Sequence, residues 1–146
     1  MTSASYGTPI SSRPAGKTLR VALWTAQCLV ALAFCASGAM KLTTPIPELG
    51  AMMPWAGQYP VAFVRTIGLI DLAGGLGILL PALSRILPRL TVWAALGCTV
   101  LQLFAIAFHL GRGEAMVLPL NFVLLPMCAF VLWGRARRAP IRARGG

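Results

Sequence analysis

Asp71 is the residue of this chain whose chemistry most needs an explanation. It lies in the apolar stretch 61–83, which is long enough to cross a bilayer, and the chain has only two other acids, Glu48 and Glu114. A carboxylate near the middle of a membrane costs roughly 2.5–3.5 kcal/mol on insertion scales. Asp71 therefore requires a cationic partner, a bound proton or a functional role.

Five other polar side chains are expected at the level of Asp71, in the half of the predicted bundle away from the chain termini. They are Lys41, Arg65, Gln102, His109 and Asn121. Six polar residues from four helices at one level predict a shared interior cluster, which is either a ligand pocket or an ion-pair network. The catalytic residue is unknown, and the candidates are Asp71 and His109, because a carboxylate and an imidazole can exchange protons.

Most of these residues also have a simpler structural interpretation. Lys41 and Arg65 can extend to the headgroup region along their apolar stems. Gln102 and Asn121 can form hydrogen bonds between helices. Asp71 lies about 15 Å deep by the rise of its helix, so it cannot easily reach the surface. It either forms a structural ion pair with Lys41 or Arg65 or serves as a functional group.

Four long apolar segments must position this cluster. The chain has 146 residues, of which 58% are hydrophobic and 11% charged, far below the roughly 25% charged residues of globular proteins. Each segment is close to the ~20 residues that span a ~30 Å hydrocarbon core, and helices satisfy their own backbone in lipid. We predict an all-α fold, an integral-membrane antiparallel bundle of four transmembrane helices. The helices are expected at about 19–41, 61–83, 89–110 and 114–134.

The segments outside the helices are short. Residues 1–18 are expected to form a disordered cytoplasmic tail, residues 19–135 the membrane domain, and residues 136–146 a basic cytoplasmic tail. The prolines of residues 43–60 argue against a long helix there. We expect that loop to form a short interfacial element, with Trp55 at the level of the lipid headgroups.

A signal peptide is the main alternative for the first apolar segment. The segment follows basic residues, and Ala31-Leu32-Ala33 resembles a cleavage site. The apolar run continues to Met40, however, which favours a helix that stays in the membrane.

The positive charge of the chain follows the predicted topology. Thirteen Lys and Arg residues against three acids give a formal net charge of +10. Ten of the basic residues flank the first helix at its start, join the second helix to the third, or follow the fourth. They are Arg13, Lys17, Arg20, Arg85, Arg89, Arg135, Arg137, Arg138, Arg142 and Arg144. The positive-inside rule then places both termini in the cytoplasm. Contact with the anionic lipids of the bilayer explains the charge better than nucleic-acid binding does.

Glycines and cysteines of the apolar segments favour structural roles. Gly68 and Gly75 flank Asp71 at one-turn spacing, which predicts that Asp71 faces a closely packed helix. The four cysteines form no C-x-x-C pair, and the single histidine stands in no ligand cluster. The residues therefore predict no metal site and make no cofactor evident.

The motifs as a set resemble the DoxX-like family of small four-helix bacterial membrane proteins. The likeness covers Leu19 to Arg135. Its matching elements are Ser37-Gly38-Ala39-Met40-Lys41-Leu42, the stretch from Ile67 to Pro81, His109 with Gly113-Glu114, and Trp133-Gly134-Arg135. In the family pattern the acid of the second helix is usually Glu, whereas this chain has Asp71, which is one methylene shorter.

The resemblance implies a multi-pass protein of the bacterial cytoplasmic (inner) membrane. Family members are often labelled oxidoreductases, and some resemble subunits of a thiosulfate:quinone oxidoreductase or of complexes that handle oxidative stress. Three hypotheses follow: an anchor or accessory subunit of a membrane-associated complex, a quinone-linked oxidoreductase subunit, and a small proton-coupled transporter. A quinone is the ligand of the second hypothesis. A soluble or membrane oxidoreductase is the expected partner, and a homo-oligomer stays open. The distances from Asp71 to Lys41 and Arg65 should separate a structural role from a functional one.

Overall fold

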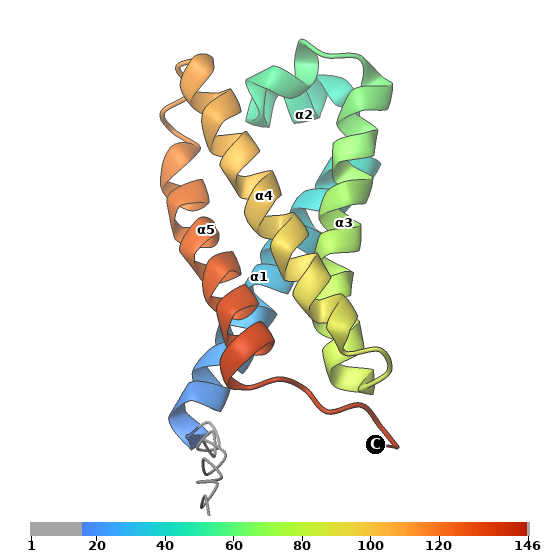
Figure 1. Cartoon of the computed structure of the whole chain (residues 1–146). Helices are drawn as coiled ribbons and strands as arrows, with labels where there is room; N and C mark the ends of the chain where they lie inside the picture. Colours follow the sequence, from blue (N-terminus) through green and yellow to red (C-terminus); the bar gives the residue numbers. More distant parts are fainter. Residues whose placement is uncertain (1–15, 146) are drawn as a thin grey trace, which may run out of the picture.

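The computed structural model describes residues 16–145, and this part of the chain contains helices and turns but no strand. Four long helices form its body: α1 (Lys17–Thr43), α3 (Val61–Ser84), α4 (Arg89–Gly111) and α5 (Leu118–Trp133). They run alternately up and down, and each packs against the next, with α5 returning to α1 (Figure 1). The predicted all-α fold, an antiparallel bundle of four helices, is confirmed.

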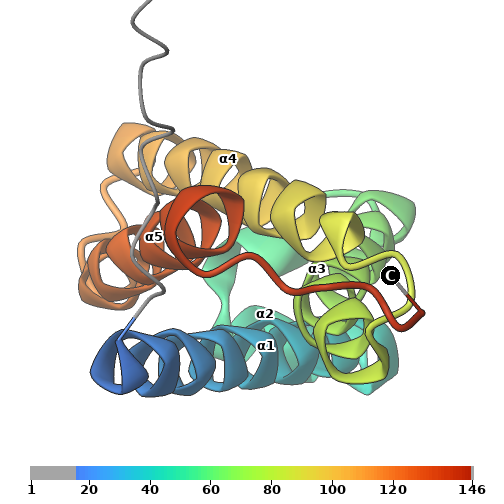
Figure 2. The ribbon, with the colours of Figure 1, turned by 60° about the horizontal axis from the view of Figure 1, so that its bottom comes forward.

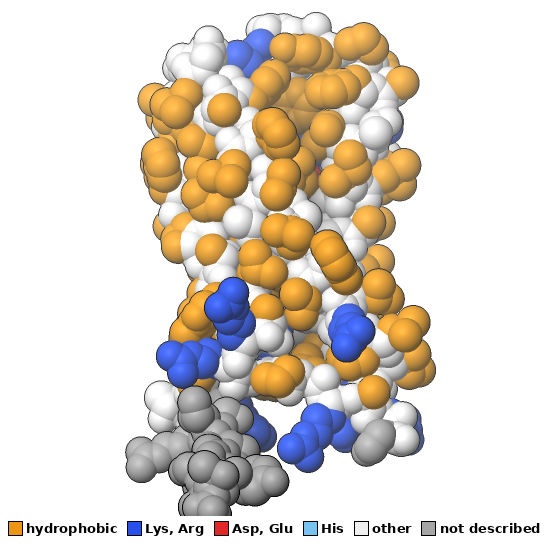
Figure 3. All heavy atoms as spheres, viewed as in Figure 1, with side chains coloured by type: hydrophobic (Ala, Val, Ile, Leu, Met, Phe, Trp, Pro, Cys, Tyr) orange, Lys and Arg blue, Asp and Glu red, His pale blue; other side chains and the backbone are white. Residues whose placement is uncertain are grey.

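The four helices have the length and composition of membrane spans. The candidate spans contain 27, 24, 23 and 21 residues, and about 20 residues are enough to cross a bilayer. Large apolar side chains point outward: Leu32, Leu69 and Phe104 are 68%, 57% and 70% exposed. Figure 3 shows such side chains along the whole height of the bundle. An apolar exterior suits lipid, so the chain is a multi-pass membrane protein.

Glycines allow α1 and α3 to approach each other closely. A Cβ atom added at Gly38 would lie 2.7 Å from the backbone oxygen of Gly68, and one added at Gly75 would lie 2.8 Å from that of Ala31. Any side chain at these positions would push the two backbones apart. Contacts between small residues of this kind hold helices together in lipid. The close approach places Asp71, which lies between Gly68 and Gly75, against α1.

The connection from α1 to α3 closes one end of the bundle, here called the α2 end. The short helix α2 (Ile46–Met52) and the 3-10 turn η1 (Pro54–Gly57) lie across it (Figure 1). Trp55 is only 7% exposed and packs with the buried Leu49 and Val64. The expected short element is therefore present, and the ring of its tryptophan is turned into the bundle. Burial of a large aromatic ring is favourable, and η1 lies over the space between the helix ends.

The opposite end, here called the terminal end, holds the start of α1, the α3–α4 turn and the residues after α5. α5 continues into a π-helical turn, η2 (Gly134–Arg138), and the chain then runs back to the α3–α4 turn (Figure 2). Arg85 Nε donates to the carbonyl of Arg142 at 3.2 Å, and the N–H of Arg144 donates to the carbonyl of Arg85 at 3.0 Å. Lys and Arg side chains gather at this end (Figure 3). The basic segment after α5 thus packs against the bundle.

Two helix starts differ from the prediction. α5 begins at Leu118 and not at residue 114, because turns occupy residues 115–117 and Pro119 lies in the first turn of the helix, where its missing N–H breaks no helical hydrogen bond. α1 begins at Lys17, two residues before the predicted start. The predicted disordered tail over residues 1–18 falls almost entirely outside the described residues.

Candidate functional site

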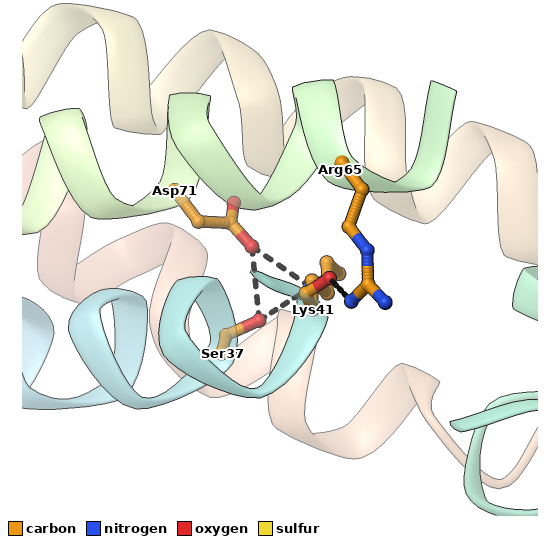
Figure 4. Close-up of polar contacts among 4 residues, drawn as sticks. All are labelled: Ser37, Lys41, Arg65 and Asp71. Carbon is orange, nitrogen blue, oxygen red and sulfur yellow. Dashed lines mark hydrogen bonds and ion pairs between the residues drawn. The ribbon is translucent and has the colours of Figure 1, made fainter. Parts of the chain in front are cut away.

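Three polar side chains form a closed group between α1 and α3. Asp71 Oδ2 accepts hydrogen bonds from Lys41 Nζ at 2.8 Å and from Ser37 Oγ at 2.9 Å, and Lys41 Nζ also donates to Ser37 Oγ. Ser37 and Lys41 are four residues apart on α1, so they face the same place on α3. Figure 4 shows the second oxygen of Asp71, Oδ1, pointing away from both. Of the two cations considered from the sequence, Lys41 is the one in contact with Asp71.

The ion pair is buried, since the side chains of Lys41 and Asp71 are each 8% exposed. Taking two charges out of water costs free energy, and a buried pair needs good geometry and further hydrogen bonds to offset that cost. Ser37 supplies one of these hydrogen bonds. Removal of either charged partner alone would leave the other buried and unpaired. The group therefore fastens α1 to α3.

Arg65 does not contact Asp71 but caps α1. Its guanidinium donates to the carbonyl of Lys41 (Figure 4) and, at 3.0 Å, to the carbonyl of Thr44. The last carbonyls of a helix lack intrahelical partners and carry partial negative charge. Arg65 satisfies that of Lys41 and also binds the carbonyl of the C-cap residue Thr44, and it thereby adds a second polar link between α1 and α3.

Four of the six predicted residues line a cavity of about 180 Å³ at the α2 end. They are Lys41, Gln102, His109 and Asn121. Ser37 also lines this cavity, whereas Asp71 and Arg65 do not. Gln102 Oε1 is buried and has no hydrogen-bond partner among residues 16–145, and a buried unpaired oxygen is costly. The predicted cluster is therefore divided into an ion pair and a polar cavity beside it.

His109 is paired with Glu114, an acid that the sequence analysis did not include among the candidate site residues. His109 Nδ1 lies 2.6 Å from Glu114 Oε2, and Arg112 Nε donates to Glu114 Oε1 at 2.8 Å. Arg112 Nη2 also donates to Gln58 Oε1 at 2.8 Å. Burial by itself would raise the pKa of Glu114, but the hydrogen bonds from His109 and Arg112 outweigh it and hold the pKa below its usual value. These contacts join the α4–α5 turn to the residue after η1.

A second buried polar group lies at the terminal end. Arg135 is 5% exposed, and its Nε donates to Gln27 Oε1 at 2.9 Å. Gln27 Nε2 in turn donates to the carbonyl of Ile78 at 2.6 Å. The guanidinium carbon of Arg135 is 4.8 Å from the ring centroid of Trp24, within the range of a cation–π contact. In the sequence Arg135 stood out as a topogenic charge and as part of the motif Trp133-Gly134-Arg135, whereas Gln27, a polar residue within an apolar run, was the missed signal of a buried polar group.

Metal-binding side chains are not grouped in the described part of the chain. No set of three or more His, Cys, Asp or Glu side chains there could hold a metal ion. The four cysteines are free thiols. Cys98 and Cys128 belong to the apolar core, where cysteine behaves as a small hydrophobe.

The fold and the buried ion pair define a small multi-pass membrane protein whose polar groups lie inside the bundle. Residues 25–131 match the model of the DoxX-like family, from within α1 to near the end of α5. The chain therefore belongs to the DoxX-like family. The match includes Lys41 and Asp71 but ends before Arg135. Neither the curated proteins nor the solved structures contain a match to this chain.

Proposed function

We propose that the protein is a non-catalytic anchor or accessory subunit of a membrane-associated complex, and that a partner protein carries the chemistry. The 2.8 Å contact between Lys41 Nζ and Asp71 Oδ2 supports this proposal most directly. A general acid or base must exchange a proton with its substrate. Asp71 Oδ2 instead accepts hydrogen bonds from two donors of α1, which favours a structural role.

The partner of this subunit is a soluble or membrane oxidoreductase, in a complex concerned with redox or oxidative-stress chemistry. Membership of the DoxX-like family supports this choice, through the properties that the sequence resemblance implies. A bacterial inner membrane is the matching location.

Both termini face the cytoplasm in this proposal. Nine of the basic residues in the described part of the chain lie at the start of α1, between the end of α3 and the first residue of α4, or after α5. They are Lys17, Arg20, Arg85, Arg89, Arg135, Arg137, Arg138, Arg142 and Arg144. At the α2 end, Lys41 and Arg65 bond to groups of the bundle itself. The positive-inside rule therefore favours a cytoplasmic terminal end. A reporter that is active only in the cytoplasm should therefore be active when fused after residue 146, and a reporter that is active only outside the cytoplasm should be inactive there.

Copurification from native membranes tests the anchor role. The tagged protein should recover an oxidoreductase, and Lys41→Met/Asp71→Leu, which removes both charges together, should recover the same amount per folded protein. Glu48→Gln removes an exposed acid of α2 and serves as the matched control. A complex that stays intact but loses quinone-dependent activity in the double variant would contradict the proposal and assign the pair to the chemistry.

A quinone site is the second candidate function, and the shape of the α2 end favours it. Beside the polar cavity lies an apolar groove of about 170 Å³. The two share four lining residues, which are Trp55, Ile67, Leu101 and Ala105. A molecule with a polar ring and an apolar tail fits such a pair of spaces. Lys41 has three N–H donors, and two are used by Ser37 and Asp71, which leaves one for a quinone oxygen.

Binding of a short-chain quinone tests this second candidate. Gln102→Leu should weaken binding from the polar side, and Phe104→Ala should weaken it from the groove. Phe122→Ala removes an exposed aromatic ring of α5 that lines neither space and is the control. If all three variants bind the quinone as tightly as the wild type does, the quinone candidate is removed and the anchor proposal is untouched.

A further inference from the structure

A cavity of about 460 Å³ at the terminal end has a strongly basic lining. Four arginines from four segments contribute to it: Arg20 of α1, Arg85 at the end of α3, Arg135 of η2 and Arg142 of the returning segment. No Asp or Glu side chain is among the lining residues. The three acids of the chain lie on α2, within α3 and after α4. The positive charge around this cavity is therefore not neutralised by acidic side chains of the protein.

Arg135 is held in place at the inner wall of this cavity. Its Nε donates to Gln27 and its Nη1 to the carbonyl of Ala139 at 3.4 Å, while Trp24 lies against its face. The remaining nitrogen, Nη2, is buried and has no hydrogen-bond partner among the described residues. An unpaired donor on a buried charged group carries a large desolvation cost. The guanidinium is thus positioned in advance, with both N–H groups of Nη2 unpaired.

Gly134 is what lets η2 bring Arg135 to this position. A Cβ atom at Gly134 would lie 2.2 Å from a methyl carbon of Leu23. Leu23 is fully buried, so its side chain has no free space into which to move. The close approach of η2 to α1 therefore depends on a glycine directly before the arginine.

We propose that this cavity binds a phosphate-bearing anion, with Arg135 as its central ligand and Arg20, Arg85 and Arg142 around it. A planar guanidinium matches phosphate oxygens and forms strong charge-assisted hydrogen bonds with them. The phosphate belongs either to a phospholipid headgroup or to a free phosphate. The exposed apolar residues Ile86 and Leu87 beside Arg85 place the cavity next to the lipid-facing surface, which favours the headgroup.

Native mass spectrometry of the full chain in a neutral detergent tests the site. The probes are phosphatidylglycerol, phosphatidylcholine and inorganic phosphate. Arg20→Gln/Arg85→Gln changes two exposed lining residues, and Arg89→Gln/Arg137→Gln removes the same charge at the same end from residues that do not line the cavity. Arg135→Gln tests the central ligand, with helix content measured by circular dichroism to show that it folds.

We expect the lining pair to weaken phosphatidylglycerol binding roughly tenfold and the control pair by less than about threefold. Phosphatidylcholine should bind weakly to every variant. Displacement of the lipid by inorganic phosphate, with binding of phosphate alone, would identify a free phosphate as the source. Lipid binding that phosphate does not displace would identify the headgroup. Equal losses of binding in the lining pair and the control pair would show a diffuse surface charge and overturn the proposal. The proposal would also be overturned if phosphatidylglycerol and inorganic phosphate bind equally well after substitution of Arg20, Arg85 and Arg135.

Discussion

The two buried polar groups of this bundle differ in how their charge is balanced. At the α2 end, Lys41 and Asp71 neutralise each other, and Ser37 forms a hydrogen bond with each of them. At the terminal end, Arg135 has a neutral amide, Gln27, as its side-chain hydrogen-bond partner. α1 contributes to both groups, so the same helix supplies a closed polar group at one end and an open one at the other.

This difference separates a structural role from a binding role. A pair that satisfies itself inside the protein stabilises the bundle without any outside molecule, although it must overcome its own desolvation. A buried cation with an unused donor instead lowers the free energy of whatever anion reaches it. The comparison therefore predicts that the closed group governs stability and that the open group governs binding.

Asp71→Asn should have the largest effect on stability. It removes the charge of Asp71 and leaves Lys41 buried and unpaired, so we expect a loss of about 3–5 kcal/mol in the free energy of unfolding. Denaturant unfolding of the purified protein in one detergent measures it. Lys41→Met/Asp71→Leu removes both charges and should recover most of this loss, to within about 2 kcal/mol of the wild type. If the double variant is as unstable as Asp71→Asn, the two residues do not act as a pair.

Arg135→Met should cost less than Asp71→Asn. The variant leaves Gln27 Oε1 buried without its donor, for which we expect about 1–3 kcal/mol, and relief of repulsion from the neighbouring arginines should offset part of this. Added phosphatidylglycerol should then raise the unfolding temperature of the wild type but not of Arg135→Met, because a ligand stabilises the state that binds it. If added lipid raises the unfolding temperature of Arg135→Met as much as that of the wild type, Arg135 is not the ligand of the lipid.

The sequence was sufficient for the fold because hydrophobic length determines the spans. Each apolar run exceeds what a bilayer requires, and Gly68 and Gly75 indicated the side of α3 on which α1 packs. The start of α5 was less predictable. Apolar residues continue back to residue 115, and Pro119, which is tolerated in the first turn of a helix, was the one local sign that the helix starts at Leu118, after the turns of residues 115–117.

The candidate site was less predictable because depth does not determine which side chains touch. By their positions along the helices, Lys41 and Arg65 both lie near the depth of Asp71. Lys41 is on the same face of α1 as Ser37, four residues away, and contacts Asp71. Arg65 instead reaches the carbonyls at the end of α1. The pairing of Arg135 with Gln27 joins residues 108 positions apart in the chain. No local pattern reveals a contact of that kind.

Glu114→Gln should have a smaller effect than either buried group. The side chain of Glu114 is 16% exposed, so loss of its bonds to His109 and Arg112 should cost about 1 kcal/mol at neutral pH. The pKa of Glu114 is lowered in the folded protein, so its stabilising contribution is present above the ordinary carboxyl pKa of about 4.3 and is lost as the pH falls through the lowered value.

Unfolding of the wild type and Glu114→Gln should therefore be compared across that range of pH. The stability difference between them should shrink on acidification below the ordinary carboxyl value. A difference that does not shrink below that value would mean that Glu114 is not held in its ionised form by these contacts. Glu48→Gln, at an exposed acid, should show little difference at any pH.

Gln102→Leu should have the smallest effect, and it tests whether an unpaired polar atom at the α2 end resembles the closed group or the open one. Gln102 Oε1 has no hydrogen-bond partner in the part of the chain that the structure describes. Replacing an unsatisfied polar group by an apolar one of similar size removes its desolvation cost. The free energy of unfolding should then change by less than about 1 kcal/mol, in the stabilising direction. A loss of more than about 2 kcal/mol would show that Gln102 has a bound partner in the purified protein, and the α2 end would then hold an open polar group beside its closed one.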